Sequence, residues 1–182
     1  MITATATPLR EKETLSSLAD LAGTIRDEAI AAARNRLAVA QRDQDLATLL
    51  PHLSFLGNFK HGLVSGVAQA LAANDQRVRA VYTYDPGLNA DSETGEETPP
   101  DMTLHLLVLV ETRSAALEAF THSLDRALAE SLKGLPAPLF AQREFILDVS
   151  LITEQDVRRG RGPAALLSAV FTPPIKVWPH EA

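Results

Sequence analysis

The segment from Asp101 to Ile152 constrains the fold of this 182-residue chain more than any other. An apolar strand is predicted at 104–110 and a second one at 145–152, with a helical pattern between them. The apolar face of that helix repeats every three or four residues, at Leu117, Phe120, Leu124, Leu128 and Leu132. Because a helix of this length can cross over a sheet between two strands, we expect a mixed β-sheet with helices on one face.

The N-terminal third has helical composition from Thr14 to about Leu50, where Pro51 ends the pattern. A break is expected near Gln41–Asp45, and residues 1–13 are expected to be frayed. An apolar stripe runs along this segment at Leu15, Leu18, Ala22, Ile25 and Ala29. The stripe must be covered, either by the rest of the chain or by a second copy. We therefore expect a homodimer through the N-terminal helices.

A second helix is predicted at 58–73, with Gly62, Gly66 and Ala70 on one stripe. Such a stripe allows another backbone to approach closely, and packing within the monomer is favoured over an oligomer contact. A strand is predicted at 78–84, where Asp85-Pro-Gly supplies turn chemistry.

The stretch 88–100 is acidic and has no apolar period, so it is predicted to be a mobile loop. A short helical turn from Thr153, a helix at 164–171 and an edge strand at 175–178 complete the pattern. The predicted class is α+β, with an N-terminal helical segment (1–57) and an α+β domain (58–182) that form one compact unit.

Composition narrows the class of function. The formal net charge is −6, which disfavours nucleic acid or an anionic membrane as the main partner. The chain has no cysteine, so disulfides and thiolate chemistry are excluded. It also lacks an apolar run long enough to span a bilayer and a signal-peptide pattern at its start, so we expect a cytoplasmic protein.

The order strand, strand, helix, strand, together with Asp148 in Phe-Ile-Leu-Asp-Val-Ser-Leu, resembles the minimal nucleotidyltransferase fold of the DNA-polymerase-beta type. The resemblance implies two acids at alternate positions of one strand and a third acid on a neighbouring strand. Together these acids hold two metal ions that clamp a triphosphate. Asp148 matches the third acid. The other two positions fall either on Asp101 and Thr103 or on Thr103 and His105, so the pair is incomplete.

The Gly-Ser turn that the resemblance implies is also replaced, by Tyr84-Asp-Pro-Gly87. We therefore expect a non-catalytic nucleotidyltransferase-like protein, a pseudoenzyme that acts as a binding or regulatory module and has no cofactor. One alternative is a divergent nucleotidyltransferase that uses Asp101 and Asp148 with Mg²⁺ or Mn²⁺. A second alternative is an interaction protein that uses its N-terminal helices, with a protein as its partner.

Two residue groups are candidate sites. Asp101, His105 and Asp148 combine an imidazole with two carboxylates, a set that suits a divalent transition metal. The competing interpretation is a solvated acid beside a packed histidine. Arg158, Arg159 and Arg161 alternate with glycine and could hold a phosphate through their guanidinium groups. The competing interpretation is an ordinary charged surface loop.

Overall fold

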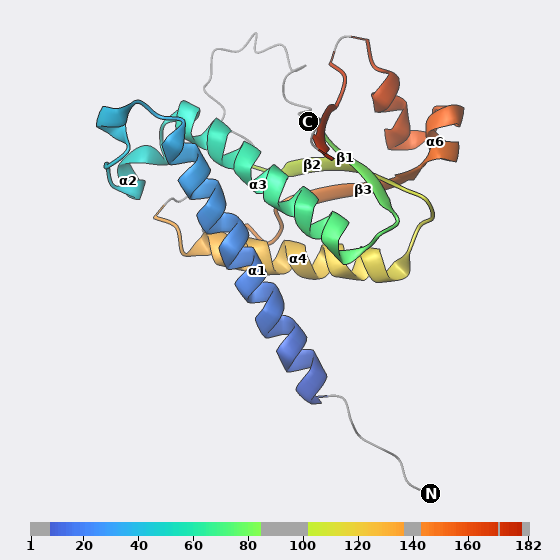
Figure 1. Cartoon of the computed structure of the whole chain (residues 1–182), viewed down its shortest axis with the longest axis horizontal. Coiled ribbons are helices and arrows are strands. Elements are labelled where there is room, and N and C mark those ends of the chain that lie inside the picture. The colour runs from blue at the N-terminus through green and yellow to red at the C-terminus, as the bar shows by residue number, and fades with distance from the viewer. Residues whose placement is uncertain (1–7, 85–101, 137–142, 171, 180–182) are drawn as a thin grey trace, which may run out of the picture.

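The computed structural model describes residues 8–84, 102–136, 143–170 and 172–179. Its centre is a four-stranded mixed sheet in the order β3-β2-β1-β4 (Figure 1). Strand β1 is antiparallel to β2 and to β4, and β2 is parallel to β3. The bounds are Val78–Tyr84 for β1, Leu104–Val110 for β2, Leu147–Thr153 for β3 and Ile175–Trp178 for β4. The predicted α+β class with a mixed sheet is confirmed.

Three long helices, α1 (Pro8–Asn35), α3 (Leu53–Asn74) and α4 (Ala115–Lys133), form a layer against one face of this sheet (Figure 1). Two short elements, η1 (Val39–Gln41) and α2 (Leu46–Leu49), connect α1 to α3. Helix α4 is the crossover between the parallel strands β2 and β3, and Ser114 caps its first turn. Among the described helices, none combines the length and the apolar character that crossing a bilayer requires.

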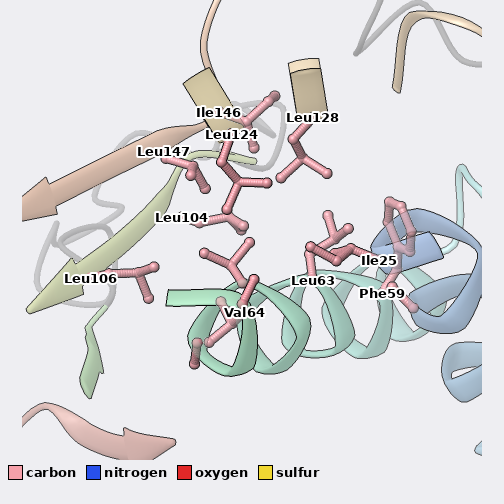
Figure 2. Close-up of a cluster of buried hydrophobic side chains, with 14 of the residues drawn as sticks. Ile25, Phe59, Leu63, Val64, Leu104, Leu106, Leu124, Leu128, Ile146 and Leu147 are labelled. Atoms are coloured by element: carbon pink, nitrogen blue, oxygen red, sulfur yellow. The ribbon is translucent and has the colours of Figure 1, made fainter. Parts of the chain in front are cut away.

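The main core lies between the sheet and the helical layer. Alternate residues of β2 point into it, and Leu104 and Leu106 are fully buried there. Figure 2 shows these two leucines between Leu63 and Val64 of α3 and Leu124 of α4. The apolar repeat of α4 therefore faces the sheet as its spacing predicts.

The described residues that cover the opposite face of the sheet, called the open face below, are fewer. Here α6 (Glu154–Arg159) and η3 (Gly162–Ser168) follow β3. Ala164 of η3 packs with Leu107 and Ile152 in a second, small apolar cluster. The expectation that all helices lie on one face is wrong for this segment, because its few apolar residues cover the end of the open face.

Several element bounds also differ from the predicted ones. Helix α1 begins at Pro8 rather than at Thr14, since a proline fits the first turn of a helix. Helix α3 begins at Leu53 rather than at residue 58, because Phe55 and Leu56 extend its buried face. The predicted helix at 164–171 is a 3₁₀ helix at 162–168. The predicted acidic loop at 88–100 lies outside the described residues.

The structure removes the argument for the predicted homodimer, which was the need to cover the apolar stripe of α1. From Leu18 to Ala29, the apolar stripe of α1 is covered by α3 and α4 of the same chain, and the exposed fractions of Leu18 and Ile25 are 8% and 3%. A Cβ atom on Gly62 would lie 2.8 Å from the Cα atom of Ala29. A Cβ atom on Gly66 would lie 2.9 Å from a methyl carbon of Ile25. The prediction that this glycine stripe packs within the monomer is confirmed.

Candidate functional site

A row of three polar or aromatic side chains crosses the open face of the sheet. Tyr84 ends β1, His105 lies near the start of β2, and Asp148 lies near the start of β3. The strand register pairs His105 with Tyr84 on one side and with Asp148 on the other. Because residues directly opposite each other share a face, the three side chains form a continuous row. We call Tyr84, His105 and Asp148 the polar row.

His105 and Asp148 are joined by a hydrogen bond. The distance from His105 Nδ1 to Asp148 Oδ2 is 2.8 Å. An ionised carboxylate can only accept, so the ring nitrogen Nδ1 is the donor in this bond. The His105 side chain is 13% exposed and the Asp148 side chain is 53% exposed. The imidazole is therefore held in one orientation, while much of the carboxylate faces solvent.

Tyr84 closes the other side of His105. The centroids of the two rings lie 5.3 Å apart and their planes are tilted by 40°. Burial raises the pKa of the Tyr84 hydroxyl, and the negative charge of Asp148 raises this pKa further. Thr83 anchors the backbone beside this ring, because its Oγ1 donates a hydrogen bond to the His105 carbonyl oxygen at 3.1 Å. The polar row thus joins an aromatic face to a carboxylate across three strands.

Asp148 faces His105, while Leu147 is buried beside it and Val149 packs against the main core, as the alternation of side chains along a strand dictates. Thr103 has a different neighbour from the one that a metal site requires. Arg143 Nη1 donates a hydrogen bond to Thr103 Oγ1 at 3.2 Å. A guanidinium group beside this position adds positive charge where the resemblance implies a metal cation.

The proposed metal group is only partly visible. Asp101 lies outside the described residues, so the structure does not show where it sits relative to His105 and Asp148. Within the described ranges, no set of three His, Cys, Asp or Glu side chains is arranged to hold a metal ion. Of the three candidate metal ligands, His105 and Asp148 are the two that the structure describes.

The three candidate phosphate-binding arginines lie away from the polar row. Asp148 is near the start of β3, whereas Arg158 and Arg159 belong to α6, which follows the end of that strand. Thr153 lies five residue steps beyond Asp148 along the extended strand, about 16 Å along the sheet. Arg158 makes an ion pair with Glu154 at 3.1 Å. The structure therefore does not bring these arginines to Asp148.

Two residues that support the site were not singled out in the sequence. Tyr84 is the last residue of a correctly predicted strand, and an antiparallel pairing of 78–84 with 104–110 would have placed it near His105. Asp125 on α4 accepts hydrogen bonds from the backbone amides of Ile146 and Leu147, at 2.7 and 2.8 Å. It thereby fixes the point at which β3 begins. The sequence around Asp125 has no motif that signals this role.

Two surface grooves lie in the helical layer. One runs between α1 and α4 and is lined by Gly23, Arg26 and Arg126 among others. A second lies between α1 and α3 above Gly62 and Gly66. Neither includes a residue of the polar row.

No protein-family model, curated protein or solved structure matches this chain. The nucleotidyltransferase resemblance therefore remains an expectation from the sequence, and a function has to be inferred from the geometry of the polar row.

Proposed function

We propose that this protein is a non-catalytic nucleotidyltransferase-like protein that acts as a binding module through the polar row. The observation that carries the proposal is the hydrogen bond from His105 Nδ1 to Asp148 Oδ2. In the resembled family a second carboxylate faces the third acid. Here an imidazole occupies that place on β2 and uses one oxygen of the carboxylate that remains.

The chemistry of metal-dependent transfer explains why this exchange matters. Two metal ions need several carboxylate oxygens, and each lost acid removes both a ligand and a negative charge. Of the two candidate positions, His105 on β2 is bonded to Asp148, and Thr103, just before β2, is bonded to the Arg143 guanidinium. Both changes lower the affinity of this edge for a divalent cation.

The side chains of the polar row favour the binding of a ligand. Asp148 is half exposed and its carboxylate can accept further hydrogen bonds, while the aromatic ring of Tyr84 lies on the far side of His105 in the same row. An aromatic face next to a fixed acceptor suits a flat ligand that carries N–H or O–H donors. The side chains that would meet such a ligand are held by β-strands, so they are pre-positioned.

Thermal unfolding with nucleoside triphosphates, with and without Mg²⁺ or Mn²⁺, tests the proposal. A ligand that binds only the native state raises its melting temperature. We expect no metal-dependent rise for the wild-type protein and no release of pyrophosphate. A metal-dependent rise, or transfer activity, would show instead the divergent enzyme that uses Asp101 and Asp148.

A restored acid pair sharpens this test. The double variant Thr103→Asp/His105→Asp places two carboxylates at alternate positions beside Asp148. Their mutual repulsion should lower the melting temperature without metal, and Mg²⁺ or Mn²⁺ should raise it again. Thr24→Asp/His122→Asp is the matched control, because it makes the same two substitutions at exposed positions of the helical layer. The control should not respond to the metal.

A further inference from the structure

Arginines gather at the end of the sheet opposite to the polar row. Register pairs Val78 with Val110 and Val110 with Thr153, so the start of β1 and the ends of β2 and β3 meet at one edge. Three chain segments cluster there, at 75–79, 111–113 and 154–161. Together they contribute six of the 17 lysines and arginines of the chain: Arg77, Arg79, Arg113, Arg158, Arg159 and Arg161. We call these residues the arginine edge.

Four acids in the same segments each pair with one arginine. Asp75 pairs with Arg77, Glu111 with Arg79, Asp156 with Arg113 and Glu154 with Arg158. The pairs from Glu111 and Asp156 link neighbouring segments, so they hold the three parts of the edge together. The six arginines exceed the four acids by two positive charges, on a chain whose net charge is −6.

Arg159 and Arg161 supply this excess. Both are exposed, and neither has an ion-pair partner among the residues that the structure describes. They flank Gly160, which ends α6 in the left-handed conformation with φ 57°, and Gly162 has φ 52°. The amide of Arg161 donates to the Asp156 carbonyl oxygen at 3.1 Å. The turn is therefore closed on α6, and it presents the two guanidinium groups from a fixed backbone.

A favourable interaction with the end of α6 explains only part of this arrangement. Basic side chains in the last turn of a helix complement its dipole, which accounts for Arg158 and Arg159. Arg161 lies beyond the helix and is not explained in this way. Exposed ion pairs contribute little to stability, so Arg113 and Arg158, whose side chains are 60% and 78% exposed, can change partner at small cost.

We propose that the arginine edge binds a free polyphosphate, with Arg159 and Arg161 as the principal contacts. Guanidinium groups bind phosphate oxygens in pairs, and several of them around one turn match a chain of phosphates better than a single one. The proposal is independent of the function proposed for the polar row, because the segments of the arginine edge adjoin the opposite ends of the strands and share no residue with that row.

Isothermal titration with inorganic triphosphate at low ionic strength tests the proposal. The wild-type protein should bind, and Arg159→Ala/Arg161→Ala should bind at least about tenfold more weakly. Arg36→Ala/Arg126→Ala is the matched control, since it removes two exposed arginines of the helical layer and changes the net charge equally. The control should stay within about twofold of wild type. Unchanged melting temperatures would confirm that the variants fold.

Further arms distinguish the sources of phosphate. A nucleoside triphosphate that binds as tightly as inorganic triphosphate shows that the phosphate chain is the group recognised, and Arg159→Lys/Arg161→Lys should bind more weakly than wild type. No binding by the wild-type protein, equal losses in the test and control variants, or a lysine variant equal to wild type would each overturn the proposal. A short oligonucleotide that binds more tightly than triphosphate would also overturn it, in favour of a nucleic-acid surface.

Discussion

The two faces of the β-sheet bury their central side chains equally but against different partners. Leu106 and Leu107 are neighbours on β2, and each is fully buried. Leu106 faces the three-helix layer and belongs to the large main core. Leu107 faces η3 and belongs to a cluster whose other buried members, among the described residues, are Ile152 and Ala164. Beside Leu107, the open face passes into the polar row.

This difference separates folding from function. On the helical side, the side chains around Leu106 are apolar. The long helices that contribute them are packed on several sides by other elements of the main core. A polar group there would lose its hydrogen bonds to water. On the open face, the described cover of α6 and η3 packs against Leu107 and Ile152. Asp148 is 53% exposed there, and the largely buried side chain of His105 is hydrogen-bonded to it, so neither polar group is left without a partner. Chemistry on this fold is therefore expected at the polar row, where polar side chains keep hydrogen-bond partners or contact with water.

The largest expected effect compares these two leucines. Leu106→Ala should lower the free energy of unfolding by about 4 kcal/mol, and Leu107→Ala by about 2 kcal/mol. The cavity left by Leu106 is walled by long helices that cannot settle inward, whereas the short η3 can move toward the cavity left by Leu107. Chemical denaturation measures both values. Equal costs would show that α6 and η3 are as firmly held as the helical layer.

A second effect probes the rigidity of the helical layer itself. Gly62→Ala places a Cβ atom 2.8 Å from the Cα atom of Ala29, so α1 and α3 must move apart, and we expect a loss of about 1–3 kcal/mol. Gly57 belongs to the same helix, but a Cβ atom added to it would have no neighbouring atom within 4 Å. Gly57→Ala should instead stabilise the protein by about 0.5–1 kcal/mol. The opposite signs can be read from thermal melts, and a shared sign would contradict the close α1–α3 contact.

Patterns within one element were predictable from the sequence. The bounds of β1 and β2 match the predicted ranges 78–84 and 104–110, because an abrupt change of period marks a strand. The orientation of Asp148 followed from alternation along a strand whose neighbours are apolar. The placement of Asp148 and His105 on one face was therefore within reach of the sequence.

Contacts between elements were not predictable in the same way. The pairing of His105 with Asp148 depends on the register of β2 and β3, and Asp125 helps to set where β3 begins from a distant helix. The stripe of α1 showed that Leu18 and Ile25 must be covered but not by which chain, since α3 and a second copy offer similar surfaces. Arg143 beside Thr103 has no signal in the sequence, because the segment between them includes a whole helix.

The smallest effect tests the electrostatics of the open face through Tyr84. Its pKa is raised, first by burial and then by the charge of Asp148. The neutral hydroxyl is thus favoured in the folded state. The resulting stability is fully present below the unfolded pKa of about 10, and it is lost as pH rises through the folded pKa. Tyr84→Phe should therefore lose less stability than wild type in this alkaline range.

The chain has two tyrosines, so Tyr82→Phe leaves Tyr84 as the only source of tyrosinate absorbance. In this background the titration midpoint should lie above the ordinary value, and adding Asp148→Asn should lower it only part of the way, because burial is the larger cause. Asparagine keeps an acceptor for His105, so the change isolates the charge. Glu118→Gln, on the exposed face of α4, is the control that should not move the midpoint. A midpoint unaffected by Asp148→Asn would mean that the carboxylate charge does not reach Tyr84, and the polar row would then be two separate contacts rather than one coupled surface.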